Sequence, residues 1–261
     1  MVSERFLRIS RFIGEEAVES LASKSVVLVG AGAVGSYCLE ALARSGVGKL
    51  RIVDFDTVGV TNINRQLLAL DSTVGKLKCD VGAQRVHDIN PQAEVEALPI
   101  FANSDTFAQI FEGEPDLVID AIDSLNPKCC LLQYAYENHF QIISSMGAAL
   151  RRNPALVRTG DLMDTWGCPL AKQVRANLRK RKVGRGIDTV FSPELVVYQY
   201  KDPQEEEQND FNEQILDRGR VRRVLGSLPT VTGIFGLTLA HLALEKLLDT
   251  DFKGEMAFRP T

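Results

Sequence analysis

Residues 26–35, Val-Val-Leu-Val-Gly-Ala-Gly-Ala-Val-Gly, constrain the fold more than any other stretch of this chain. A short valine-rich run predicts a buried strand, and Gly30, Gly32 and Gly35 follow it in the spacing G-x-G-x-x-G. Glycines here let backbone N–H groups approach a phosphate at the start of the next helix, where the helix dipole favours an anion. Asp54 ends the next apolar run, where a carboxylate that holds ribose hydroxyls is expected. The pattern predicts a nucleotide-binding unit, and both NAD and ATP fit it.

The rest of the first 150 residues repeats this alternation of apolar runs and helical periodicity. The expected strands are 26–29, 50–53, 117–119 and 141–143, with 94–99 as a weaker candidate, and the expected helices are 36–44, 78–89 and 126–138. Strands that alternate with helices are typical of a parallel sheet with crossover connections. We therefore predict an α/β fold with a Rossmann-like, mostly parallel sheet.

Beyond residue 150 the pattern changes. Two further strands, 156–161 and 195–200, are expected on either side of a helix whose apolar stripe is Leu170, Val174 and Leu178. The acidic run 202–213 predicts a loop, and the apolar stretch from Thr230 predicts a long core helix. We predict a single domain, 1–261, with a nucleotide-binding α/β core in 1–150 and an extension of strands and helices in 151–261.

The connection that follows Asp54 favours ATP over NAD. A nicotinamide ring needs an apolar wall, whereas a triphosphate needs cations and a carboxylate that can hold Mg²⁺. This connection is polar and cationic, and its chemistry-bearing residues are Asp54, Asp56, Asn62, Arg65, Gln66, Lys76 and Lys78. Asp120 and Asp123 follow another expected strand at the sheet edge where α/β folds bind ligands. We predict Asp123 as the magnesium ligand and Asp120 as a structural residue.

Charge is segregated along the chain. The net charge of −4 argues against a general nucleic-acid-binding protein, yet 172–187 holds seven cations and no acid. These cations are candidate RNA contacts, or alternatively an ordinary solvated helix face; they are Lys172, Arg175, Arg179, Lys180, Arg181, Lys182 and Arg185.

The remaining composition favours a cytoplasmic protein. The five cysteines are odd in number and irregular in spacing, which fits a reducing compartment, and the N-terminus lacks the apolar run of a secretory signal. His241, Glu245 and Lys246 interrupt the apolar C-terminal stretch, so we expect a core helix and no membrane association.

Five motifs in this order and spacing resemble the adenylating domain of the ubiquitin-activating-enzyme-like (ThiF/MoeB/HesA) superfamily. They are Gly-Ala-Gly-Ala-Val-Gly, Asp-Phe-Asp, Thr-Asn-Ile-Asn-Arg-Gln, Val-Gly-Lys-Leu-Lys and Asp-Ala-Ile-Asp-Ser, and 226–236 also resembles the superfamily's C-terminal helix entry. The resemblance implies that Asp54 binds ribose, that Asn62, Arg65 and Lys78 surround the phosphates, and that Asp123 holds Mg²⁺. It implies activation of a carboxylate by its attack on the α-phosphate of ATP, with Arg65 and then Lys78 as the groups that stabilise the developing charge. Asp56 and Gln66 complete the expected nucleotide site; Asp56 also fits a structural role, and Asn62 and Gln66 also fit turn and cap positions.

Two substrates compete within this superfamily. Members that activate the C-terminal glycine of a ubiquitin-like sulfur carrier usually hold zinc on two C-x-x-C pairs, and this chain has none, so no zinc is expected. The stretch 164–194, with its Pro-Leu-led basic helix and Val-Phe-Ser segment, resembles the zinc-free tRNA threonylcarbamoyladenosine dehydratases. That resemblance implies ATP-dependent cyclisation of the modified adenosine beside the tRNA anticodon. A third interpretation is a nucleotide-dependent scaffold without turnover that assists sulfur transfer.

The resemblance also carries expectations about partners. It implies a homodimer in which an N-terminal arginine of one subunit, Arg8 or Arg11, completes the site of the other, although both also fit helix-surface positions. A sulfur-transfer protein is a further expected partner. Cys168 precedes the basic helix, where it fits either a nucleophile or, as we favour, a small packed residue.

Overall fold

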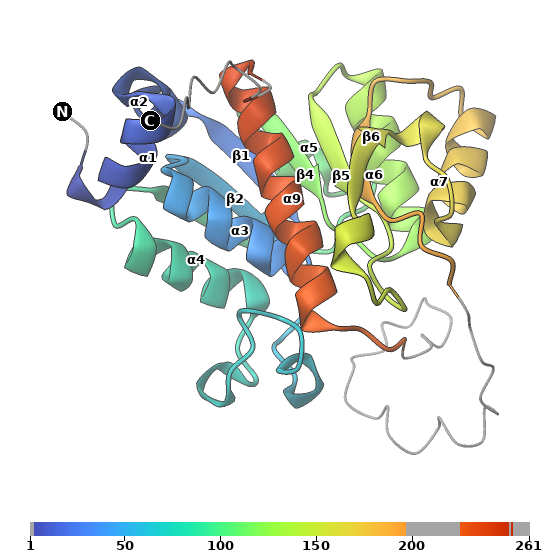
Figure 1. Cartoon of the computed structure of the whole chain (residues 1–261), viewed down its shortest axis with the longest axis horizontal. Helices are drawn as coiled ribbons and strands as arrows, with labels where there is room; N and C mark the ends of the chain where they lie inside the picture. Colours follow the sequence, from blue (N-terminus) through green and yellow to red (C-terminus); the bar gives the residue numbers. More distant parts are fainter. Residues whose placement is uncertain (1–2, 197–224, 251, 253–261) are drawn as a thin grey trace, which may run out of the picture.

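The computed structural model describes residues 3–196, 225–250 and 252. Its centre is a seven-stranded sheet with the strand order β3-β2-β1-β4-β5-β7-β6 (Figure 1). The strands are β1 (Ser25–Val29), β2 (Lys49–Val53), β3 (Glu94–Leu98), β4 (Leu117–Asp120), β5 (Ile142–Ser145), β6 (Arg158–Asp161) and β7 (Asp188–Phe191). All neighbours pair in parallel except β6, which runs antiparallel to β7 at the edge. The predicted α/β fold is confirmed, and strands from both sides of residue 150 share one sheet.

Helices cover both faces of the sheet. In β1, Val26 and Leu28 pack into one core with α3, α4 and α9, whereas Val27 and Val29 pack into a second core with α5, α6 and α7. Burial on both faces explains why the central strands are continuous apolar runs. The helices are α1 (Leu7–Ile13), α2 (Glu15–Ser23), α3 (Gly35–Ser45), α4 (Lys78–Ile89), α5 (Phe107–Ile110), α6 (Leu125–Glu137), α7 (Pro169–Lys180) and α9 (Pro229–Leu248). Short 3-10 turns occur at Glu4–Phe6, Val60–Asn62, Asp71–Thr73, Pro154–Leu156 and Leu162–Asp164.

The long C-terminal helix α9 lies across the sheet beside α3 (Figure 1). A Cβ atom at Gly236 would lie 2.4 Å from the carbonyl oxygen of Val34, so only glycine allows this close approach. Among the described helices, α9 alone is long and apolar enough to cross a membrane, but 56% of that stretch is buried inside the protein. Its apolarity is accounted for by packing in the core.

The expected helices and the first strands match the structure within two residues at nearly every end. The extension differs from the prediction in two places. Residues 154–156 form a 3-10 turn in which the Asn153 side chain accepts a hydrogen bond from the Ala155 N–H, so β6 begins at Arg158. The strand after the basic helix is β7, at 188–191, and of the expected strand 195–200 only the irregular 195–196 are described. The predicted acidic loop, 202–213, lies outside the described residues.

Candidate functional site

The glycine loop connects β1 to α3 at the carboxyl edge of the sheet. Gly30 has a φ of +96°, and its N–H donates to the Val53 carbonyl at 2.8 Å. A Cβ at Gly35 would lie 1.8 Å from the Gly30 carbonyl oxygen, so this position also requires glycine. No described side chain caps the start of α3. The N-terminal end of this helix therefore has the geometry of an anion site.

Asp54 and Asp56 follow β2 and join the glycine loop to α4. The Asp54 carboxylate accepts hydrogen bonds from the N–H groups of Ala31 (2.7 Å) and Asp56 (2.9 Å). The Asp56 carboxylate pairs with the buried Lys78 ammonium, with 2.9 Å between Oδ2 and Nζ. Burial raises the pKa of Asp54, and the nearby Lys78 charge partly offsets that effect. The structure thus brings three predicted nucleotide contacts together beside the glycines.

The turn 61–66 supplies the remaining polar groups. The Asn62 side chain accepts from the Gly59 N–H at 3.0 Å, and Arg65 Nη1 donates to the Thr61 carbonyl at 2.9 Å. Gln66 is buried, its Nε2 atom lies 3.9 Å from the position a Cβ on Gly32 would take, and its Oε1 atom has no hydrogen-bond partner. A buried amide oxygen without a hydrogen-bond partner beside the glycine loop fits a polar ligand bound against that loop.

Asp120 and Asp123 follow β4, and the two carboxylates differ in environment. Asp120 is fully buried, whereas Asp123 is exposed and accepts a hydrogen bond from the Ser124 hydroxyl at 3.3 Å. Asp120 Oδ1 accepts from the Ile122 N–H at 3.0 Å, which holds the loop that carries Asp123. Mg²⁺ commonly takes one or two carboxylates together with phosphate oxygens, so one exposed carboxylate at this edge suits that role. The described residues contain no cluster of three or more His, Cys, Asp or Glu for a metal held by protein alone.

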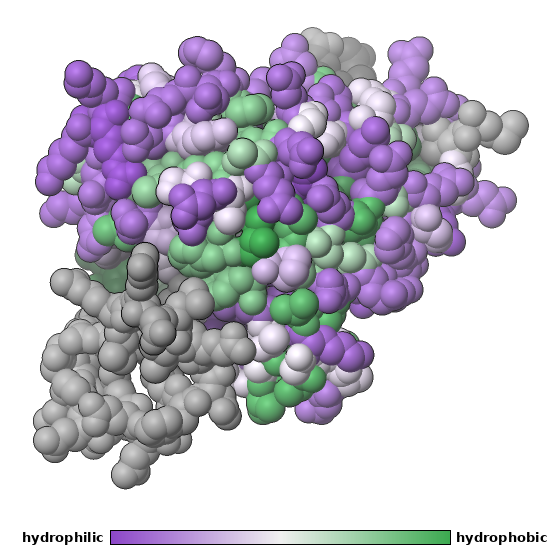
Figure 2. Space-filling view, turned by 180° about the vertical axis from the view of Figure 1, so that it is seen from behind, coloured by the Kyte–Doolittle hydropathy of each residue, from purple (hydrophilic) through white to green (hydrophobic). Residues whose placement is uncertain are grey.

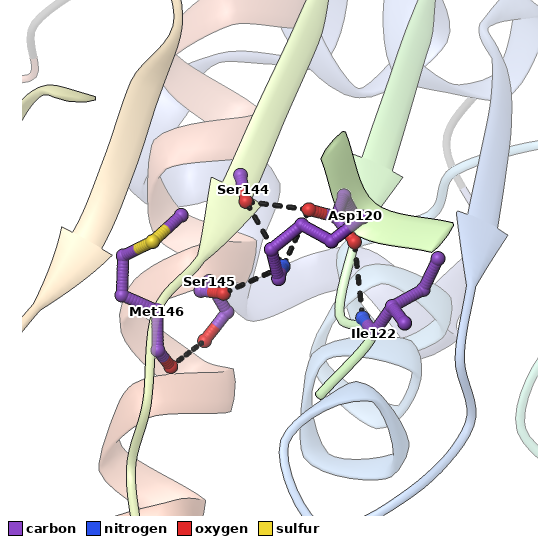
Figure 3. Close-up of polar contacts among 6 residues, drawn as sticks. Asp120, Ile122, Ser144, Ser145 and Met146 are labelled. Carbon is purple, nitrogen blue, oxygen red and sulfur yellow. Dashed lines mark hydrogen bonds and ion pairs between the residues drawn. The ribbon is translucent and has the colours of Figure 1, made fainter. Parts of the chain in front are cut away.

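The partner of Asp120 is Lys128, which the sequence analysis missed. Lys128 Nζ lies 2.5 Å from Asp120 Oδ2 and also donates to the Ser145 carbonyl at 2.9 Å and the Ser144 hydroxyl at 3.2 Å. Figure 3 shows the Asp120 and Ser144 side chains facing each other across the ends of β4 and β5, where the hydroxyl donates at 2.6 Å. Both members of the ion pair are completely buried. A signal was available, because Lys128 follows Asp120 by eight residues and lies in the first turn of α6, but a helical lysine ordinarily faces solvent.

The basic residues of 172–187 divide into two groups. Three of them bond within the protein: Arg175 donates to Thr165, Arg181 to Asn126, Cys130 and Gln133 of α6, and Arg185 pairs with Asp164. The other four, Lys172, Arg179, Lys180 and Lys182, are exposed and form no ion pair within the described residues. Within the described residues, only Arg185 of these seven is neutralised by an acid, whereas Arg175 and Arg181 bond to neutral groups and keep their charge. The four exposed cations without an ion pair are the charges most accessible to a ligand.

The N-terminal arginines lie far from the glycine loop of their own chain. Arg8 and Arg11 are exposed on α1, and the neighbouring Arg5 donates to the carbonyl of Ile89. Ile89 ends the helix that Lys78 begins, a separation of about 17 Å. Cys168 is buried, and its sulfur accepts a long hydrogen bond from the Ala171 N–H at the start of α7.

This geometry defines a nucleotide-type site: an open helix N-terminus, a buried aspartate after the second strand, cations on the next connection, and an exposed carboxylate beside it. A family model described as the ThiF family matches residues 4–260, and the chain belongs to that family. It is similar to the tRNA threonylcarbamoyladenosine dehydratase of Bacillus subtilis (strain 168), with 38% identity over 253 residues that cover 95% of this chain and 97% of the relative. The resemblance found in the sequence motifs is confirmed.

Solved structures agree with this assignment. The Escherichia coli tRNA N6-threonylcarbamoyladenosine dehydratase in complex with AMP matches with a TM-score of 0.82 and 33% identity, covering 95% of this chain and 97% of that one. The same enzyme in complex with ATP matches with a TM-score of 0.81, 33% identity and the same coverage.

Proposed function

We propose that this protein uses ATP to cyclise threonylcarbamoyladenosine in tRNA. The observation that carries the proposal is the full-length similarity to tRNA threonylcarbamoyladenosine dehydratases, combined with the polar site at the glycine loop. A carboxylate oxygen of the threonyl group attacks the α-phosphorus of ATP, and pyrophosphate leaves. An atom of the carbamoyl group then displaces AMP from the acyl carbon and closes a ring. The nucleoside loses the elements of one water, and ATP becomes AMP and pyrophosphate.

Each predicted site residue has a role in this proposal. Asp54 accepts the ribose hydroxyls, while Gly30, Gly32 and Gly35 let the phosphates approach the start of α3. Asn62, Gln66 and Lys78 orient the phosphates, Asp56 holds Lys78, and Arg65 stabilises the charge that develops as pyrophosphate leaves. Asp123 is the residue that would hold Mg²⁺, an ion that neutralises phosphate charge when bound.

The activity is tested with tRNA that carries the modified nucleoside. We expect wild-type protein with ATP and Mg²⁺ to lower the nucleoside mass by one water and to release AMP in equal amount. tRNA without the modification serves as the control and should release no AMP. An unchanged nucleoside mass together with no AMP formation would contradict the proposal. Turnover with a sulfur-carrier protein and none with tRNA would support the alternative, adenylation of a C-terminal glycine.

We also propose that two copies pair in solution and are found in the cytoplasm with their substrate. The protruding segment 57–77 carries exposed apolar side chains, and Figure 2 shows hydrophobic surface gathered there, at the lower end of that face. Its exposed large residues are Val60 (67%), Ile63, Leu70 (52%) and Val74. Such a surface fits burial against another copy, whose Arg8 or Arg11 would then reach this site. A sulfur-transfer protein as a further partner stays a prediction of the resemblance.

We expect the exposed cations of the basic segment to bind tRNA phosphates. Removing three of them together in the variant Arg179→Ala/Lys180→Ala/Lys182→Ala should weaken tRNA binding and reduce the slope of log K against log[salt] by about 2 to 3 units. Fluorescence anisotropy of labelled tRNA over a salt series measures this slope.

The matched control removes three cations outside the basic segment, just before β1, at the start of β2 and on the last turn of α3. Lys24, Arg44 and Lys49 are each paired with an acid, so the variant Lys24→Ala/Arg44→Ala/Lys49→Ala changes the net charge equally without touching the basic segment. It should keep the wild-type slope. Equal slopes for both triple variants would mean that total charge, not this surface, governs binding.

A further inference from the structure

The single tryptophan of this chain, Trp166, is exposed in a fixed position. Its side chain is 59% exposed, and its ring makes an edge contact with Phe191, with 5.1 Å between ring centroids and 71° between ring planes. Phe191 is buried at the end of β7. The tryptophan is therefore anchored on one side to the core while most of its surface meets solvent.

The backbone beside Trp166 is also held in place. Gly167 has a φ of +68°, and a Cβ there would lie 2.3 Å from the Pro193 carbonyl oxygen, so this position packs backbone against backbone. The next residue, Cys168, is buried and caps the start of α7. On the other side, Thr165 is buried and its hydroxyl donates to the Leu162 carbonyl at 2.8 Å. Because the chain on both sides is held in place, the exposed ring is pre-organised and loses little freedom when a ligand covers it.

Trp166 lies on the edge of the sheet that carries the nucleotide site. Strands β4, β5 and β7 are parallel, and Phe191, like Asp120, stands at a carboxyl end. A Cβ built on Gly147, just past β5, would lie within 4 Å of both Leu170 and Cys168, so this loop packs beside the start of α7. The start of α7 therefore lies at the same edge as Asp123, with the connection after β5 between them.

The surface that runs away from Trp166 is basic. The helix α7 begins beside the tryptophan and ends at Lys180, about 17 Å away along its axis. Of the four exposed, unpaired cations, Lys172 lies on the first turn of this path and Arg179, Lys180 and Lys182 lie at its far end. The surface along α7 thus carries an exposed aromatic ring at the end of the helix that lies on the nucleotide-site edge, and positive charge at the other end of the helix.

We propose that Trp166 is a stacking platform for an unpaired base of the RNA substrate. This inference rests on the proposed function. A nucleoside beside the anticodon lies in a single-stranded loop, whose splayed bases stack on aromatic side chains while the adjoining stem is held through phosphates. The arrangement matches that substrate. An unpaired base of the loop would stack on Trp166, and the phosphates of the stem would bind the cations along α7.

The test uses a labelled anticodon stem-loop that carries threonylcarbamoyladenosine. Trp166→Ala should weaken binding about 5-fold to 150-fold, the cost of losing one stacked base, without changing the slope of log K against log[salt]. Trp166→Phe should restore most of the affinity, whereas Trp166→Leu, which is apolar but lacks a π face, should not. In wild-type protein the emission of the single tryptophan should be quenched as RNA saturates it, a readout that needs no variant.

Phe12→Ala is the matched control, because Phe12 is 75% exposed on α1 at the opposite edge. It should keep wild-type affinity and RNA-dependent quenching. Trp166→Ala or Trp166→Leu binding like wild type overturns the inference, as does emission that RNA leaves unchanged. Emission that changes with protein concentration but not with RNA assigns the ring to contact between copies and also overturns it. A wild-type protein that neither binds nor converts the modified RNA is a different result, since that outcome contradicts the proposed function itself.

Discussion

Replacing Arg65 by alanine is expected to slow AMP formation on modified tRNA by about 100-fold to 1000-fold, the usual cost of removing one donor that stabilises transition-state charge. The structure favours Arg65 over Lys78 for this role. The Lys78 ammonium is already paired with the Asp56 carboxylate at 2.9 Å, so part of its charge is neutralised. Arg65 has no ion pair within the described residues, and its Nη1 bonds only to groups of its own turn. Single-turnover measurement of pyrophosphate release at saturating ATP isolates this step, because AMP leaves only when the ring closes.

Two further variants separate charge from geometry at this position. Arg65→Lys keeps the charge but loses the planar fork of donors, so it should recover only part of the rate. Arg85→Ala is the control, because Arg85 is paired with Glu40 between α3 and α4 and takes no part in the proposed site. Its rate should stay within about twofold of wild type. A wild-type rate for Arg65→Ala would transfer the role to Lys78 or to an arginine of the partner subunit.

The sequence predicted those parts of the site that depend on local spacing. Gly30, Gly35 and Asp54 belong to one strand-turn-helix-strand unit, where glycine spacing and apolar periodicity fix the geometry within about 30 residues. The turn 61–66 was identified through its motif, since its polar residues show no periodicity. Of the side chains in this turn, Gln66 is the one that the structure places against Gly32 of the glycine loop.

The features that the sequence did not predict depend on contacts between distant segments. Lys128 is buried only because β4 and β5 are neighbours, which places Asp120 and Ser144 together. The division of the basic residues into paired and unpaired groups depends on where Asp164 and α6 come to lie. Strand β7 is four residues long and follows a basic run, so its pairing with β5 and β6 decides its structure more than its own composition.

The buried ion pair between Lys128 and Asp120 is expected to have a large effect on stability. Lys128→Met is expected to lower the free energy of unfolding by about 3 to 5 kcal/mol, because it leaves the buried Asp120 carboxylate without its counter-charge. Chemical denaturation with urea measures the change. An m value equal to that of wild type would show that the variant exposes the same amount of surface on unfolding. The Ile122 N–H bond to Asp120 couples this pair to the loop that carries Asp123. We therefore expect the folded variant also to turn over more slowly.

Removing both charges separates the net contribution of the ion pair to stability from the cost of leaving one buried charge without its partner. The double variant Asp120→Leu/Lys128→Met should recover much of the lost stability, because replacing a buried pair by apolar side chains of similar volume is often neutral or better. It should not recover activity if Asp120 is needed to hold the Asp123 loop. Lys24→Met is the matched control: Lys24 also pairs with an aspartate beside the central sheet, but that pair is partly exposed, at 28% and 39%, so the loss should be about 1 kcal/mol or less. Similar losses for Lys24→Met and Lys128→Met would contradict the importance assigned to burial, since the two pairs share their chemistry and differ chiefly in their contact with water.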